Sequence, residues 1–160
     1  MCISGHFNFS KNYTVQKRYN EQLIKYNKTF RIITFLRDPL DLKISLYNYL
    51  KKNSQINEKI EINDFIFNGN NFLANALNCN HSNYKEIIST YFFIGFVNDF
   101  EDSLDKLSKL INVKYNKITR KNVSKTKFKI SNDLKKLFIK SNELDYKIYE
   151  FAKKRSITND

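Results

Sequence analysis

The apolar run at residues 30–36 ends abruptly at Arg37-Asp38-Pro39, and this junction constrains the fold more than any other feature of the chain. A short β-branched and aromatic run bounded by a turn signal is typical of an interior strand of an α/β sheet. Pro39 disfavours a helical conformation at Asp38 and so ends the strand. Pro in the first turn, behind an Asp N-cap, then starts a helix. We therefore expect a strand at residues 30–36 and a helix at residues 38–52.

This corner is a candidate anion-binding site. Ligands of open α/β sheets bind at the carboxyl ends of the strands, which is where Arg37 is expected. A guanidinium grips phosphate with two parallel hydrogen bonds, which an ammonium does not reproduce. Ser45 follows about two helical turns later and could reach the same anion. The alternative interpretation is a local ion pair at an ordinary helix start.

The rest of the chain predicts one helix-rich domain around a short sheet. A second apolar run, with the sequence YFFIGFV, predicts another buried strand. The further expected elements are a short helix at 62–67, a loop at 68–71, a helical or irregular segment at 72–77, a helix at 101–110, a basic loop at 112–129 and one long helix that starts at Ser131. We expect Tyr146, Ile148, Tyr149 and Ala152 in this last helix to pack in the core.

The string IITFLRDPLDLKISLYNYL at residues 32–50 resembles carbohydrate sulfotransferases that use 3′-phosphoadenosine-5′-phosphosulfate (PAPS). The similarity is to the heparan sulfate and uronyl 2-O-sulfotransferases and their bacterial-type relatives. It implies that Arg37 and Ser45 clamp the 3′-phosphate of the nucleotide cosubstrate. Leu42 stands where the family usually has a second Arg.

The amino-terminal Gly5-His6-Phe7-Asn8-Phe9 is similar to the Gly-His-x-x-Phe segment of the same family. The resemblance makes His6 the candidate catalytic base. Sulfuryl transfer needs a group that takes the proton of the attacking sugar hydroxyl, and imidazole titrates near neutral pH. The alternative is that His6 only packs beside Phe7 and Phe9.

The segment at residues 120–152 resembles the closing part of the uronyl 2-O-sulfotransferases, with a basic loop before a final helix. Arg120 and Lys121 match the basic pair of that loop, so the resemblance implies contacts with the nucleotide or with a sulfated glycan. In a chain so rich in lysine, such a pair can also be solvated surface. Val97 and Asn98 replace the Thr and Glu that the family usually has after its second strand.

The family's glycine-rich loop for the 5′-phosphosulfate has no counterpart in this sequence. Such a loop needs glycines, so that backbone N–H groups reach the anion, and a Lys followed by a hydroxyl residue. The three glycines, Gly5, Gly69 and Gly95, lie in unrelated contexts. We therefore expect an α/β, partial P-loop-NTPase-like sulfotransferase fold over residues 1–160. It is expected to be a single, amino-terminally incomplete domain that is inactive alone.

The amino-acid composition limits the kinds of partner that this chain is expected to bind. A net charge of +12 favours an anionic partner. The resemblance implies PAPS as cosubstrate and a carbohydrate acceptor, with nucleic acid less favoured. The alternative function is a noncatalytic anion-binding module for nucleic acid or sulfated glycan.

Cys2 and Cys79 lack metal-ligand spacing, so no metal is expected. No apolar run approaches the roughly 20 residues of a membrane span. We expect a cytoplasmic protein if it is bacterial-type, or a Golgi one if an upstream anchor exists.

Overall fold

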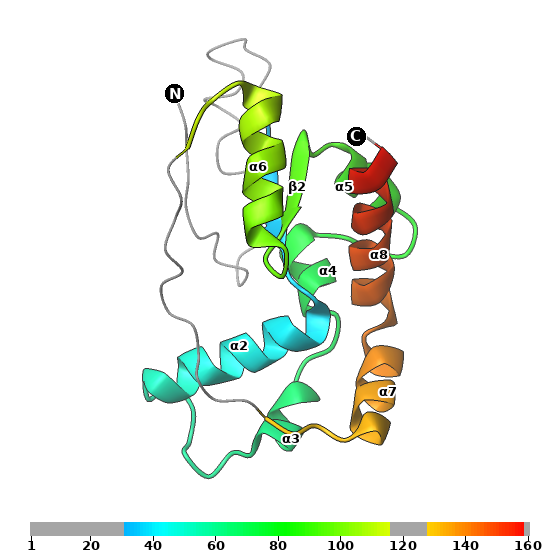
Figure 1. Ribbon diagram of the computed structural model, residues 1–160. Coiled ribbons are helices and arrows are strands. Elements are labelled where there is room, and N and C mark those ends of the chain that lie inside the picture. The colour runs from blue at the N-terminus through cyan, green and yellow to red at the C-terminus, as the bar shows by residue number, and fades with distance from the viewer. Residues whose placement is uncertain (1–30, 116–127, 159–160) are drawn as a thin grey trace, which may run out of the picture.

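A short parallel sheet with helices on both sides organises the computed structural model, which describes residues 31–115 and 128–158 (Figure 1). Strands β1 (Ile33–Leu36) and β2 (Phe93–Phe96) pair in parallel, with Ile33 opposite Phe93 and Leu36 opposite Phe96. The α/β class is therefore confirmed. The helices of the described residues are α2 (Pro39–Lys52), α3 (Ile62–Ile66), α4 (Phe72–Leu77), α5 (Tyr84–Ser89), α6 (Phe100–Ile111), α7 (Asn132–Ser141) and α8 (Glu143–Thr158).

The corner between β1 and α2 forms as its sequence predicts. Asp38 is the N-cap of α2, and one carboxylate oxygen accepts hydrogen bonds from the N–H groups of Leu40 at 2.9 Å and Asp41 at 3.2 Å. Pro39 occupies the first helical position and is buried. The capped helix then runs across the end of the sheet (Figure 1). The local chemistry of three residues thus turns the chain at the carboxyl end of β1.

Two apolar clusters hold the helices in place. In the first, α8 packs on the sheet: the rings of Phe96 and Tyr149 meet edge-on with centroids 5.5 Å apart, and Ile148 and Ala152 are buried beside them. The second joins α2, α3 and α7 and includes Tyr47, Phe65 and Phe138. The expected core positions of the last helix are confirmed for Ile148, Tyr149 and Ala152, while Tyr146 is half-buried and packs against the second cluster. None of the described helices is both long and apolar enough to cross a membrane.

The carboxyl-terminal half departs from the prediction of one long helix after Ser131. Ser131 does cap a helix, because its side chain accepts from the N–H of Leu134. This helix is α7, however, and it ends at Ser141 with Asn142 as its C-cap. Helix α8 begins at the following residue. The side chain of Asn142 is fully buried and accepts from the N–H of Asn71 at 2.8 Å. A long-range contact therefore interrupts the helix. Helix α5 is a second element that the sequence pattern did not predict.

A buried polar cluster ties α4 to α8. The Asp145 carboxylate accepts from the N–H of Leu73 at 2.9 Å and of Ala74 at 2.7 Å, and so caps the start of α4 from another helix. The Lys43 ammonium donates to the C=O of Asn68. Burial raises the pKa of Asp145, although its two backbone hydrogen bonds act against this. Burial also lowers the pKa of Lys43, against the opposing charge of Asp145. Both charges are tolerated because each has hydrogen bonds and an opposite charge nearby.

Asp145→Ala is expected to lower the free energy of unfolding by about 3 kcal/mol, because it leaves two buried N–H groups without their acceptor and removes the opposite charge near Lys43. Asp145→Asn keeps one acceptor oxygen and is expected to lose less. Urea unfolding at neutral pH measures both variants. Equal losses for the two variants would contradict the cap.

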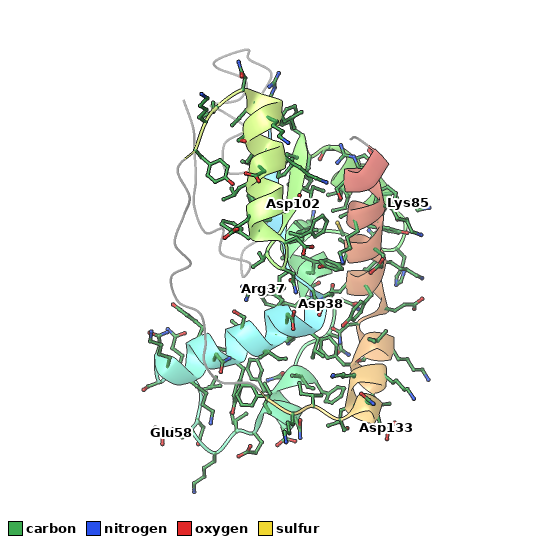
Figure 2. The ribbon with its side chains drawn as sticks, viewed as in Figure 1. Arg37, Asp38, Glu58, Lys85, Asp102 and Asp133 are labelled. Atoms are coloured by element: carbon green, nitrogen blue, oxygen red, sulfur yellow. The ribbon has the colours of Figure 1, made fainter. Side chains whose placement is uncertain are left out.

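Lys43→Met is expected to change how stability depends on pH. The pKa of Lys43 is lower in the folded chain than the ordinary value of 10.5, so the unfolded state holds the proton to higher pH. Folding is therefore penalised below the folded pKa, and this penalty fades as the pH rises toward 10.5. Unfolding free energies of wild type and Lys43→Met should converge or cross over this range. The matched variant Lys85→Met, at an exposed lysine (Figure 2), should run parallel to wild type.

Candidate functional site

Arg37 leaves the end of β1 at the corner, beside Asp38 (Figure 2). Its side chain is half-buried. Within the described part of the chain, no hydrogen bond or ion pair engages its guanidinium. The Asp38 carboxylate instead caps α2. Arg37 and Asp38 therefore do not form the ion pair of the alternative interpretation, and no described residue occupies the guanidinium donors.

Ser45 lies on α2, seven residues after the N-cap and about 10 Å further along the helix axis. The helical period puts it on the same face as Asp38 and Asp41. This face meets the loop after β2, because the side-chain amide of Asn98 donates to the Asp41 carboxylate at 3.0 Å. Arg37 directly precedes the N-cap of this helix, and Ser45 follows about two turns later. Asp41 lies between the two along that face.

The charge at this corner is mixed. Burial raises the pKa of Tyr149 to about 12, together with the nearby carboxylates of Asp38, Asp99 and Asp41, which act in the same direction. Burial also raises the pKa of Asp38, while its backbone hydrogen bonds and the charge of Lys153 act in the opposite direction. Three carboxylates therefore accompany the cations of Arg37 and Lys153. An anion can bind here only through directed hydrogen bonds from the guanidinium, since the surrounding field does not favour it.

The remaining predicted site residues, His6, Arg120 and Lys121, lie outside the described residues. Asn98 also lies at this corner, although its sequence pattern predicts no role in the site. Its position directly after a buried strand was the available signal. Such a residue lies at the same sheet edge as Arg37.

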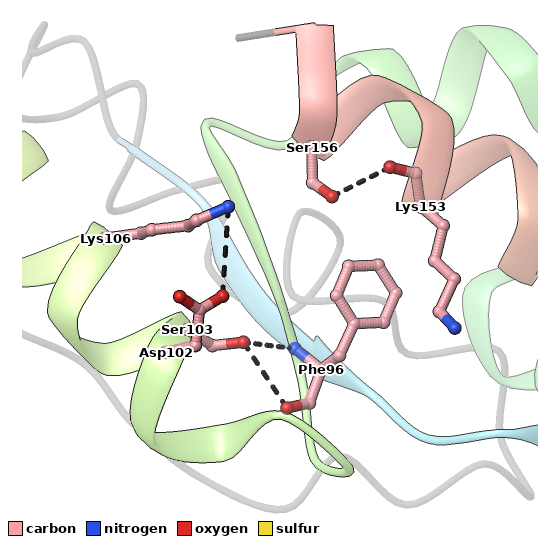
Figure 3. Close-up of polar contacts among 6 residues, drawn as sticks. All are labelled: Phe96, Asp102, Ser103, Lys106, Lys153 and Ser156. Carbon is pink, nitrogen blue, oxygen red and sulfur yellow. Dashed lines mark hydrogen bonds and ion pairs between the residues drawn. The ribbon is translucent and has the colours of Figure 1, made fainter. Parts of the chain in front are cut away.

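A cavity of about 530 Å³ is lined by residues of β2, α6 and α8. Figure 3 shows six of these residues. One wall is fixed by Ser103 of α6, whose hydroxyl accepts from the N–H of Phe96 at 2.8 Å and donates to its C=O at 3.3 Å. Lys106 and Asp102 form an exposed ion pair at the rim, 3.8 Å apart. Lys153 lines the cavity from α8. No pattern in the sequence predicted this cavity, since its walls come from segments far apart in the chain.

Other catalytic chemistries find little support in the described residues. No group of three or more His, Cys, Asp or Glu side chains there is placed to hold a metal ion. Burial raises the pKa of the Cys79 thiol to about 11, which disfavours the reactive thiolate. A smaller cavity of about 260 Å³ lies beside the buried Lys43 and the loop around Gly69.

A scan against protein-family models matches no family, and searches of curated proteins and of solved structures also give no match. The resemblance to sulfotransferases therefore rests on the sequence motifs alone.

Gly95→Ala is expected to destabilise the chain by about 1–3 kcal/mol. A methyl group at Gly95 would overlap the Phe35 ring and meet the Cβ of Ser103 at 3.0 Å, so β2 and α6 would separate. Urea unfolding measures the loss. The double variant Phe35→Leu/Gly95→Ala should lose less than the sum of the single variants, because the smaller side chain relieves the overlap. Strictly additive losses would contradict the close approach.

Proposed function

We propose that this chain is a PAPS-dependent carbohydrate sulfotransferase domain of the P-loop-NTPase-like class, with Arg37 and Ser45 as ligands of the nucleotide's 3′-phosphate. One observation carries the proposal. A half-buried guanidinium, with no hydrogen bond or ion pair in the described part of the chain, lies at the carboxyl end of a parallel strand. Burying such a group without a partner is costly, and a bound anion removes that cost.

The reaction moves a sulfuryl group from PAPS to a sugar hydroxyl. The hydroxyl oxygen forms a bond to sulfur, the bond between sulfur and the 5′-phosphate oxygen breaks, and adenosine 3′,5′-bisphosphate leaves. His6 is the proposed acceptor of the hydroxyl proton. Arg120 and Lys121 are the proposed further contacts of the nucleotide or of a sulfated glycan. Arg37 and Ser45 would orient the nucleotide without touching the transferred group.

A second candidate function is a noncatalytic anion-binding module. The glycine content favours it, because three glycines in separate contexts do not make a loop for the phosphosulfate. Electrostatic stabilisation of the transferred group is usually the largest contribution to such catalysis. We accordingly expect no measurable sulfate transfer from labelled PAPS by this chain alone, with nucleotide binding retained.

Arg37→Ala is expected to weaken the binding of adenosine 3′,5′-bisphosphate by about 10- to 100-fold, the usual effect of removing a charge-assisted hydrogen bond. Isothermal titration calorimetry at physiological salt measures the affinity. Arg31→Ala is the matched control, because it removes the same charge from the exposed, opposite end of β1. It should leave the affinity nearly unchanged.

The same two variants separate the candidate functions. Sulfotransferase-type recognition predicts a saturable site that depends on Arg37 and persists in moderate salt. A general polyanion module predicts equal losses for Arg37→Ala and Arg31→Ala, with heparin or nucleic acid bound just as well at low salt. That second result would refute the assignment of Arg37 to the 3′-phosphate.

A further inference from the structure

The outer edge of β2, which faces away from β1, carries a site that the proposed sulfuryl transfer does not use. The cavity of about 530 Å³ is lined by residues of β2, α6 and α8, six of which are drawn in Figure 3. Its volume lies within the range of roughly 300–1,000 Å³ that is typical of small-molecule sites.

The backbone of β2 directs one donor and one acceptor toward this cavity. In a parallel pair, the N–H and C=O groups of successive residues point alternately to one side and to the other. Val97 faces β1, because its N–H donates to the C=O of Leu36 at 2.8 Å. Phe96 faces the outer side, where both of its groups bond the Ser103 hydroxyl. Ile94, two residues earlier, therefore also directs its N–H and C=O outward, and Ile94 lines the cavity.

Side chains close the edge of β2 on both sides of Ile94. At the amino end, Arg155 donates to the C=O groups of Ile88 at 2.9 Å and Tyr91 at 2.8 Å. At the carboxyl end, Ser103 holds Phe96. An additional full-length strand could pair with β2 only by displacing these hydrogen bonds. Natural proteins commonly protect exposed strand edges by covering them in this way. A ligand of ring size needs only the central pair of groups and leaves both closures intact.

The walls favour an aromatic ligand. Phe92, Phe93 and Phe96 line the cavity from β2, and Leu110 and Ala152 line it from α6 and α8. The charged side chains of Lys106 and Asp102 lie at the exposed rim. Lys153, Arg155 and Ser156 also line the cavity. Predominantly apolar walls with a few polar groups are the usual composition of a site for a flat, mostly apolar molecule.

We propose that this cavity binds a nucleobase-type nitrogen heterocycle, whose ring edge pairs an acceptor with the Ile94 N–H and a donor with the Ile94 C=O. The site is separate from the anion corner, and it stands whether or not Arg37 holds a phosphate. A neutral nucleoside suits it, because the donor and acceptor that it needs are both on the base.

Adenosine is the probe, and N6,N6-dimethyladenosine is the matched ligand that lacks the amino hydrogens. Adenosine is expected to move the backbone amide signal of Ile94 in ¹⁵N–¹H NMR spectra of the wild-type chain. The signal of Gly95, whose N–H faces β1, should move less. The dimethyl analogue should bind about tenfold more weakly, since one hydrogen bond is lost and the C=O of Ile94 is left without its donor. An unmoved Ile94 signal, or equal binding of the two nucleosides, would overturn the proposal.

Ser156→Trp tests the location of the site, because Ser156 lines the cavity from α8 and the larger side chain fills it. This variant should abolish adenosine binding. Glu150→Trp, at an exposed position of the same helix outside the lining, should bind as wild type does. Arg37→Ala should also bind adenosine normally, which separates this site from the proposed nucleotide corner. Adenosine binding that survives in Ser156→Trp would refute the cavity as the site.

Discussion

The parallel pairing of β1 with β2 is the constraint on which the other features depend. It brings Arg37 and the loop after β2 to one end of the sheet, although they are about 60 residues apart in the chain. It also fixes the direction of each backbone group along β2. Gly95 permits the sheet and α6 to approach closely, because a methyl group there would overlap the Phe35 ring and meet the Cβ of Ser103 in α6 at 3.0 Å. The corner and the outer edge are therefore two consequences of one strand pair.

The net charge of +12 says less about the anion corner than the local arrangement does. Three carboxylates, those of Asp38, Asp41 and Asp99, lie near Tyr149. Two of them are already acceptors, in the cap of α2 and toward Asn98. Diffuse positive charge is screened over about 8–10 Å in physiological salt. The proposed anion binding therefore depends on directed hydrogen bonds from Arg37 and Ser45 and not on net charge.

The sequence predicted those parts of the fold that local chemistry decides. The strand, the Asp38 cap and the start of α2 follow from adjacent residues, and they were predicted closely. The break between α7 and α8 was not, because Asn142 is held by Asn71, which is 71 positions away. The cap of α4 by Asp145 escaped for the same reason. Leu137, next to the buried Phe138 on α7, is 56% exposed, because only one side of that helix is covered.

The sequence also indicated the corner but not the cavity, and the reason is physical. A cation and a proline at a strand end form a pattern of adjacent residues that can be recognised in the sequence. No sequence pattern predicts the outward N–H and C=O of Ile94, because almost every residue has these groups and only the strand pairing decides where they point. Their availability depends further on Arg155 and Ser103, which close the edge on either side. A strand edge that is closed at both ends and open at one residue does not add a strand readily. It can accept a small planar ligand. The hydrogen bonds of Arg155 and Ser103, which protect the edge against pairing with another strand, also limit the exposed part of the edge to one residue.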